Sequence, residues 1–160
     1  MYKVKVMIWR EKNLQNNFRI MFLGLQNAIK EYLEHGCYTG KIDEVEAYLV
    51  ASIHALMDYA DRFLENDESI LACRYVNNTI KHAGGFVTHK EITGGLTFPM
   101  FFPSEFKEIK FIWKNNADLE CRYINQKEAY IHYFAGKELL ETLNPLADMI
   151  ENGIENKFCK

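Results

Sequence analysis

The stretch "LQNNFRIMFLGLQNAIKEYLEHG", residues 14–36, decides the fold, because its apolar residues recur every three or four positions. The positions that follow this spacing are Leu14, Phe18, Met21, Phe22, Leu25, Ile29 and Leu33. They predict an amphipathic helix from Asn13 to about His35, closed by Gly36. The preceding residues 2–9, "YKVKVMIW", alternate basic and apolar side chains, which fits either a short strand or a frayed first helical turn.

Two further helices follow. The first should run from about Ile42 to Glu65, with a buried stripe of Ile42, Val45, Leu49, Ile53, Leu56, Ala60 and Phe63. Its N-terminal end, the positive pole of the helix dipole, carries Asp43, Glu44 and Glu46. The link 36–41 is short, so this helix should pack antiparallel to the one before it. The next helix should run from about Asp67 to His82 and end at Gly84-Gly85.

After residue 85 the apolar period shortens towards two. The segment "FVTHKEITGGLTFPMFF", residues 86–102, carries a Thr-Gly-Gly-Leu turn between two apolar runs and predicts a β-hairpin, whose second arm the prolines confine to a sheet edge. The later "KEIKFIWK" could add a strand, so we expect a small β insertion at about 86–114. A last helix should span about Gln126 to Asn156, bent or divided at Gly136 and Pro145.

The bulk composition fits one helical domain over residues 1–160, a four- to five-helix bundle of the mainly α class with the β insertion inside it. Its 48% hydrophobic and 26% charged residues are those of a globular protein. The four cysteines show no metal-site or disulfide spacing, and no secretory or membrane-spanning segment is visible. We therefore expect a cytoplasmic protein with reduced thiols, no membrane association, no metal and no cofactor.

The charge is segregated along the chain. Residues 1–30 carry six basic and one acidic side chain, and residues 31–70 carry two basic and ten acidic ones, although the whole chain is only −3. That net charge argues against a dedicated nucleic-acid-binding protein, which depends on phosphate neutralisation. Either a local basic face exists, or the acidic and basic helices attract each other within the fold.

The stretch "CRYVNNTIKHAGG", residues 73–85, carries the strongest candidate for chemistry. On a helix, Arg74, Asn78 and His82 lie at i, i+4 and i+8 and form one polar stripe, here called the polar ribbon, with Asn77 and Lys81 beside it. A guanidinium can grip phosphate oxygens and an imidazole can move a proton near neutral pH. The alternative is structural, because polar side chains in the last turns of a helix also satisfy its free carbonyl groups.

Residues 74–82, "RYVNNTIKH", after two long antiparallel helices, resemble the signature region of HEPN-type domains. That resemblance implies a helical bundle, commonly homodimeric, and in many members a metal-independent ribonuclease of toxin–antitoxin or phage-defence systems. It makes His82 the residue that assists attack by the ribose 2′-hydroxyl, Asn78 the polar residue of the motif and Arg74 the phosphate ligand. Seven residues separate Arg74 from His82, which is more than the family motif has, and Asn77 takes the usual arginine position.

Two functions therefore follow from the sequence. The first is a HEPN-like, RNA-directed homodimer that is either a ribonuclease or a catalytically weakened relative. The second is a non-catalytic interaction module that binds a protein partner through the β insertion. Weaker candidates are His54 with Asp58 and Asp61 as a metal or proton-transfer set, and isolated His89 and His132.

Overall fold

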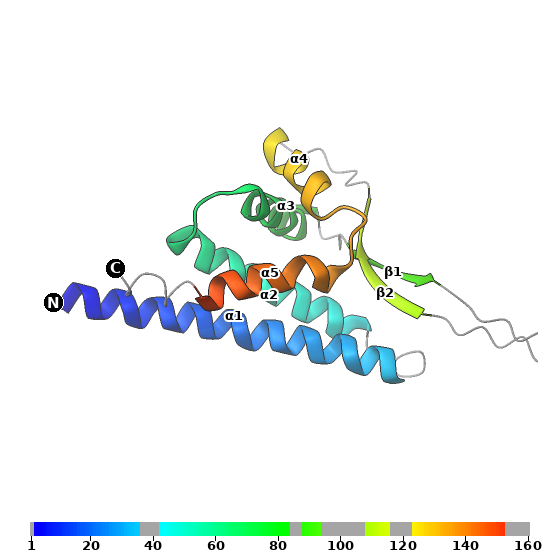
Figure 1. Cartoon of the computed structure of the whole chain (residues 1–160), viewed down its shortest axis with the longest axis horizontal. Helices are drawn as coiled ribbons and strands as arrows, with labels where there is room; N and C mark the ends of the chain where they lie inside the picture. Colours follow the sequence, from blue (N-terminus) through cyan, green and yellow to red (C-terminus); the bar gives the residue numbers. More distant parts are fainter. Residues whose placement is uncertain (1, 36–41, 84–87, 94–107, 116–122, 153–160) are drawn as a thin grey trace, which may run out of the picture.

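The computed structural model of this protein describes residues 2–35, 42–83, 88–93, 108–115 and 123–152. These residues form five helices and one two-stranded antiparallel sheet, which lies between the third and fourth helices (Figure 1). The elements are α1 (Tyr2–His35), α2 (Ile42–Phe63), α3 (Glu68–Ala83), β1 (Thr88–Thr93), β2 (Glu108–Trp113), α4 (Ile124–Tyr133) and α5 (Leu139–Asn152). The mainly α class and the β insertion are thus confirmed.

The first helix is longer than the sequence pattern indicated. Residues 2–9 belong to α1, so their interpretation as a strand is wrong, because each residue added to an existing helix gains a backbone hydrogen bond. At the other end Leu33 is 49% exposed while Tyr32 is buried. Four residues rotate by 400°, which is 40° more than one full turn. Apolar residues spaced by four therefore drift around the helix, until Leu33 leaves the buried face.

Helices α1 and α2 pack against each other as the expected antiparallel pair, with α5 beside them (Figure 1). At Gly24 of α1, an added Cβ would collide with the ring of Tyr48 on α2. Phe18, Leu25 and Leu49 lie in the core between the helices. None of the helices in the described ranges is both long enough and apolar enough to cross a membrane.

The two strands are fixed to the bundle at one end. All six residues of β1 pair with β2, from Thr88 opposite Trp113 to Thr93 opposite Glu108. Trp113 is fully buried, stacks on Phe134 at 4.6 Å between ring centroids, and donates its indole N–H to the Thr142 hydroxyl at 2.8 Å. The predicted turn after Thr93 and the second arm of the hairpin lie in residues 94–102, outside the described part of the chain.

The single last helix of the sequence prediction is divided at Gly136, and Pro145 sits inside α5 without ending it. Gly136 has a φ of 72°, which favours glycine, and its N–H donates to the Trp113 carbonyl at 3.0 Å. A Cβ at this position would also collide with Asn115 Oδ1. The break therefore turns α4 back to meet the end of β2.

Gly136→Ala should lower the free energy of unfolding by about 2 kcal/mol, because alanine is strained at this φ and its Cβ meets Asn115. Urea denaturation followed by circular dichroism measures the loss. In an Asn115→Ala background the collision is gone and only the backbone strain of about 1–2 kcal/mol remains, so the loss should shrink. An equal loss in both backgrounds would contradict the steric part of this prediction.

Candidate functional site

The helix that carries the polar ribbon starts at a side-chain cap. Asp67 Oδ1 accepts hydrogen bonds from the Ile70 backbone N–H at 3.0 Å and from the Ser69 hydroxyl at 2.6 Å. An aspartate cap of this kind satisfies backbone donors that the first helical turn leaves open. Ile70, Cys73 and Val76 are fully buried, as their spacing predicted. The opposite side of α3 therefore displays the polar ribbon.

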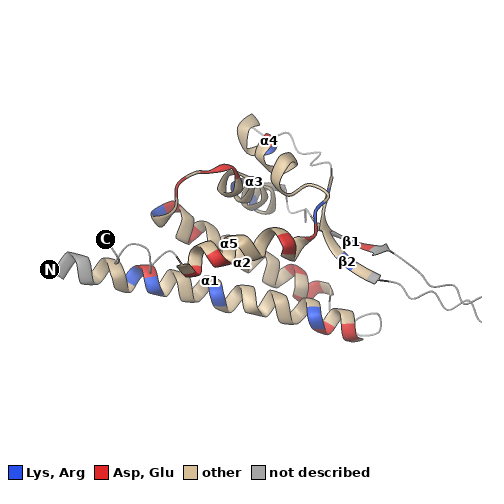
Figure 2. Ribbon diagram, viewed as in Figure 1, with Lys and Arg blue, Asp and Glu red and all other residues tan. Residues whose placement is uncertain are grey.

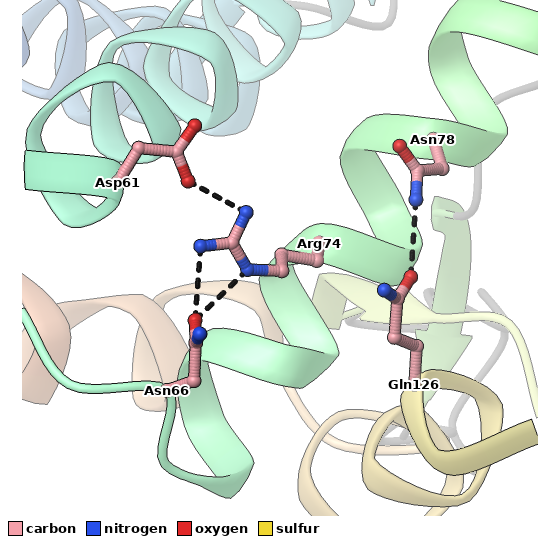
Figure 3. Close-up of polar contacts among 5 residues, drawn as sticks. All are labelled: Asp61, Asn66, Arg74, Asn78 and Gln126. Atoms are coloured by element: carbon pink, nitrogen blue, oxygen red, sulfur yellow. Dashed lines mark hydrogen bonds and ion pairs between the residues drawn. The ribbon is translucent and has the colours of Figure 1, made fainter. Parts of the chain in front are cut away.

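Arg74 is held by its own chain (Figure 3). One terminal nitrogen forms an ion pair with Asp61 Oδ1 of α2 at 2.6 Å, and the other terminal nitrogen and Nε donate to Asn66 Oδ1 at 2.9 and 3.0 Å. These contacts occupy all three guanidinium nitrogens and leave the side chain 26% exposed. In this arrangement the Arg74 charge is already neutralised by a carboxylate.

The charge around Arg74 also disfavours a phosphate. Glu65, Asp67 and Glu68 are exposed in the link between α2 and α3 and at the start of α3, and Figure 2 shows the acidic colour of that link. Together with Asp61 they place four carboxylates in the corner that holds Arg74 and Arg62. A nucleic-acid backbone approaching this corner would be repelled rather than attracted.

Asn78 and Asn77 are also used within the fold. The Asn78 side-chain amide donates to Gln126 Oε1 of α4 at 3.0 Å, so it joins α3 to α4 (Figure 3). Asn77 is 7% exposed, and its side-chain oxygen has no hydrogen-bond partner among the described residues. The Asn78 amide is bonded to Gln126 and the Asn77 amide is buried, so neither is placed to orient a catalytic imidazole.

His82 and Lys81 differ from the other ribbon residues, because both are exposed in the last turn of α3. Nothing in the described residues forms a hydrogen bond or ion pair with the His82 side chain. It lies two helical turns from Arg74, which is about 12 Å along the axis. Within one chain the two residues are therefore not brought together.

The secondary candidates do not assemble a metal site. His54 is half-buried and its Nε2 lacks a hydrogen-bond partner among the described residues, whereas Asp58 is exposed and Asp61 is engaged by Arg74. In the described ranges no cluster of three or more histidine, cysteine or acidic side chains could hold a metal ion. The side chain of His89 is outside the described part of the structure.

His132, which the sequence left isolated, contacts Glu68 Oε1 through Nδ1 at 2.6 Å and so joins α4 to the start of α3. Cys73 is an unpaired cysteine, and burial raises the pKa of its thiol far above the ordinary value, so it does not act as a nucleophile. A groove of about 370 Å³ exists elsewhere, between α1 and α5, and no ribbon residue lines it.

Arg74 and Asn78 thus join α3 to neighbouring parts of the chain, whereas His82 does not. Sequence reasoning found Arg74 and Asn78, but it did not identify their partners Asp61, Asn66 and Gln126 as such. Two of those partners lie on other helices, at sequence separations that helical periodicity does not report. Comparison of the chain with family models, with curated proteins and with solved structures found no match.

Arg74→Ala should lower the free energy of unfolding by about 1 kcal/mol, because it releases the α2–α3 corner from a partly exposed ion pair. The matched control is Arg62→Ala, which removes an exposed arginine near the end of α2. In a double-mutant cycle Asp61→Asn should show coupling with Arg74→Ala and none with Arg62→Ala. Equal losses for the two arginine variants would contradict this role of the ion pair.

His54 should make stability depend on pH. Burial and the nearby charge of Lys81 lower the pKa of His54 from its ordinary value of 6.5, although Asp58 partly opposes this. As the pH falls, His54 is therefore protonated in the unfolded chain at a higher pH than in the folded chain. The free energy of unfolding should fall as the pH drops below about 6.5. Thermal melts over this range should show a smaller acid loss in His54→Gln than in the exposed control His82→Gln. The same acid loss in both variants would rule out His54 as its source.

Proposed function

We propose that this chain is a HEPN-like helical module without the catalytic arrangement, and that it acts by binding a protein partner through its β insertion. The observation that carries the proposal is the ion pair of Arg74 with Asp61, together with the hydrogen bonds that Arg74 donates to Asn66. Stabilising the charge of a phosphate in a transition state requires a cation that is free to meet it. Here that cation would first have to break an ion pair inside an acidic corner.

The β insertion has the properties of a docking element. Its base is rigid, because Trp113 is buried and the backbone N–H of Trp113 donates to the Lys137 carbonyl at 3.0 Å. One face of the two-stranded sheet rests on α1, where the Lys90 ammonium of β1 donates to the Tyr32 hydroxyl at 2.6 Å. Figure 1 shows β1 and β2 at one side of the helices, pointing away from them.

The outer edge of β1 has no neighbouring strand among the described residues. An open strand edge presents backbone N–H and C=O groups that an extended peptide can pair with. The partner class that this edge fits is therefore a protein segment that adds a strand beside β1.

A second candidate function, RNA binding of the HEPN type, rests on one observation. Lys81 and His82 are exposed next to each other at the end of α3, where a phosphate and a ribose hydroxyl could reach them. Two copies of this corner would have to meet for His82 to be joined by a cation from the other subunit.

A cleavage assay separates the two functions. Single-stranded RNA incubated with the purified chain in the presence of EDTA should stay intact, and Arg74→Ala should change stability rather than any RNA signal. Metal-independent cleavage that His82→Ala abolishes, with an unchanged melting temperature, would overturn the non-catalytic proposal.

The partner-binding half of the proposal is tested by site-specific photo-crosslinking in the cells that produce the protein. A photoreactive amino acid at Glu91, which is exposed on β1, should form a covalent adduct with one partner protein. The control position is Glu44, exposed at the start of α2. The absence of an adduct at Glu91, or the same adducts at both positions, would contradict binding through β1.

A further inference from the structure

The outer face of α1 carries apolar side chains that the fold does not cover. Figure 1 shows α1 at one edge of the molecule, with the other helices on its inner side only. Val6 is 46% exposed, Trp9 67%, Ile20 61% and Leu23 54%. They lie half a turn around the helix from the buried Phe18 and Leu25. Exposed tryptophan and isoleucine on one face mark an interaction surface.

These four residues follow a regular pattern. Together with Asn13 and Asn16 they are spaced alternately by three and four residues from position 6 to position 23, and we call this set the outer stripe. The alternation is that of the contact positions of a coiled coil. The order is apolar, apolar, Asn, Asn, apolar, apolar, so it reads the same from either end.

We infer that the outer stripe is a homodimer interface in which α1 packs antiparallel against α1 of a second copy. A two-fold axis between residues 14 and 15 places Val6 against Leu23 of the partner subunit and Trp9 against Ile20 of the partner subunit. The same axis places Asn13 against Asn16 of the partner subunit, where the two amides can hydrogen-bond to each other. Every position of the stripe then meets a matching one, as a two-fold interface requires.

Charge selects the antiparallel orientation over the parallel one. Residues 6–12 expose Arg10 and Lys12, a charge of +2, because Glu11 is buried within the fold, while residues 17–23 expose Arg19 alone, a charge of +1. Parallel helices would place +2 beside +2, whereas antiparallel helices place +2 beside +1. The two positive helix N-termini are also kept apart.

The two asparagines select a second copy of the chain over a lipid surface. A helix with exposed Trp9 and basic neighbours could lie on an anionic membrane. In that position Asn13 and Asn16 would enter the apolar layer at the centre of the stripe without a partner, which is costly. Paired with each other across the axis, they instead fix the register of the two helices.

The dimer should be weak and reversible. The stripe runs for about 26 Å, and a helix about 10–12 Å wide covers roughly 300 Å² over that length. An interface of this size belongs with weak, transient contacts rather than obligate ones. Lys12 lies near Arg19 of the partner subunit, so added salt should screen this repulsion and strengthen association.

This dimer does not depend on the proposed function. Helix α2 packs between α1 and α3, so the polar ribbon lies on the far side of the molecule from the outer stripe (Figure 1). Two chains joined through α1 hold their His82 side chains apart. A negative photo-crosslinking result at β1, or an unexpected result in the cleavage assay, therefore leaves the dimer inference unchanged. A monomeric chain would likewise leave the proposed function unchanged.

Sedimentation equilibrium of the full chain over a range of concentrations tests the inference. Ile20→Glu should raise the dimer dissociation constant at least about a hundredfold, because it places a charge in the apolar contact of both subunits. The matched control is Ile124→Glu, which charges an isoleucine of α4 that is 71% exposed and should leave the dissociation constant unchanged. Circular dichroism checks that both variants keep the fold, as expected for exposed positions.

The orientation is tested by mixing two variants that dimerise weakly alone. Val6→Lys and Leu23→Glu chains mixed in equal amounts should form a heterodimer in the antiparallel arrangement, because the new ammonium group at position 6 then meets the new carboxylate at position 23 of the other chain. Parallel helices would not join these two positions and would show no rescue.

The inference is overturned if the chain is monomeric at every concentration, if Ile20→Glu and Ile124→Glu act alike, or if mixing gives no rescue. It is also overturned if a chain that stays monomeric in solution sediments with phosphatidylcholine–phosphatidylserine vesicles in a way that Ile20→Glu abolishes. That result would assign the outer stripe to an anionic membrane.

Discussion

The buried indole of Trp113 is the contact on which the second half of the structure depends. Its stacking on Phe134, its bond to Thr142 and its backbone bonds to Lys137 and Gly136 join β2, α4 and α5 at one point. A large aromatic side chain contributes much of the local burial, and a buried N–H must find an acceptor. The positions of the β insertion and of α4 both follow from this one residue.

Helix α4 in turn decides what the polar ribbon of α3 can do. Once α4 is placed, Gln126 lies against Asn78 and His132 lies against Glu68, so two polar groups of α3 become contacts within the chain. Arg74 is likewise bonded within the α2–α3 corner, with its side chain 26% exposed. A side chain that is fully engaged in the free protein can bind a ligand only after those contacts break, which opposes binding.

The molecule therefore has two unlike sides. On one side, Arg74 and Asn78 of α3 form contacts within the chain. On the other side, α1 exposes Trp9 and Ile20 to solvent. Covering exposed apolar surface lowers the free energy of the system, whereas polar groups that already form hydrogen bonds within the chain gain little from a partner. Among the described residues, the surfaces left without a neighbour are the outer stripe and the outer edge of β1.

The sequence by itself determined most of the helical segments, because a period of 3.6 residues is a local property. It placed α2 and α3 to within a few residues, and it predicted that the last helix bends or divides at Gly136 and Pro145, of which only Gly136 lies at a break. Local patterns could not report that residues 2–9 extend α1, since their alternation fits two structures. Only the tertiary structure decided the roles of Arg74 and Asn78. Asp61 neutralises Arg74 and Asn66 accepts its hydrogen bonds, while Gln126 accepts a hydrogen bond from Asn78. Contacts between separate helices depend on packing, and packing leaves no period in the sequence.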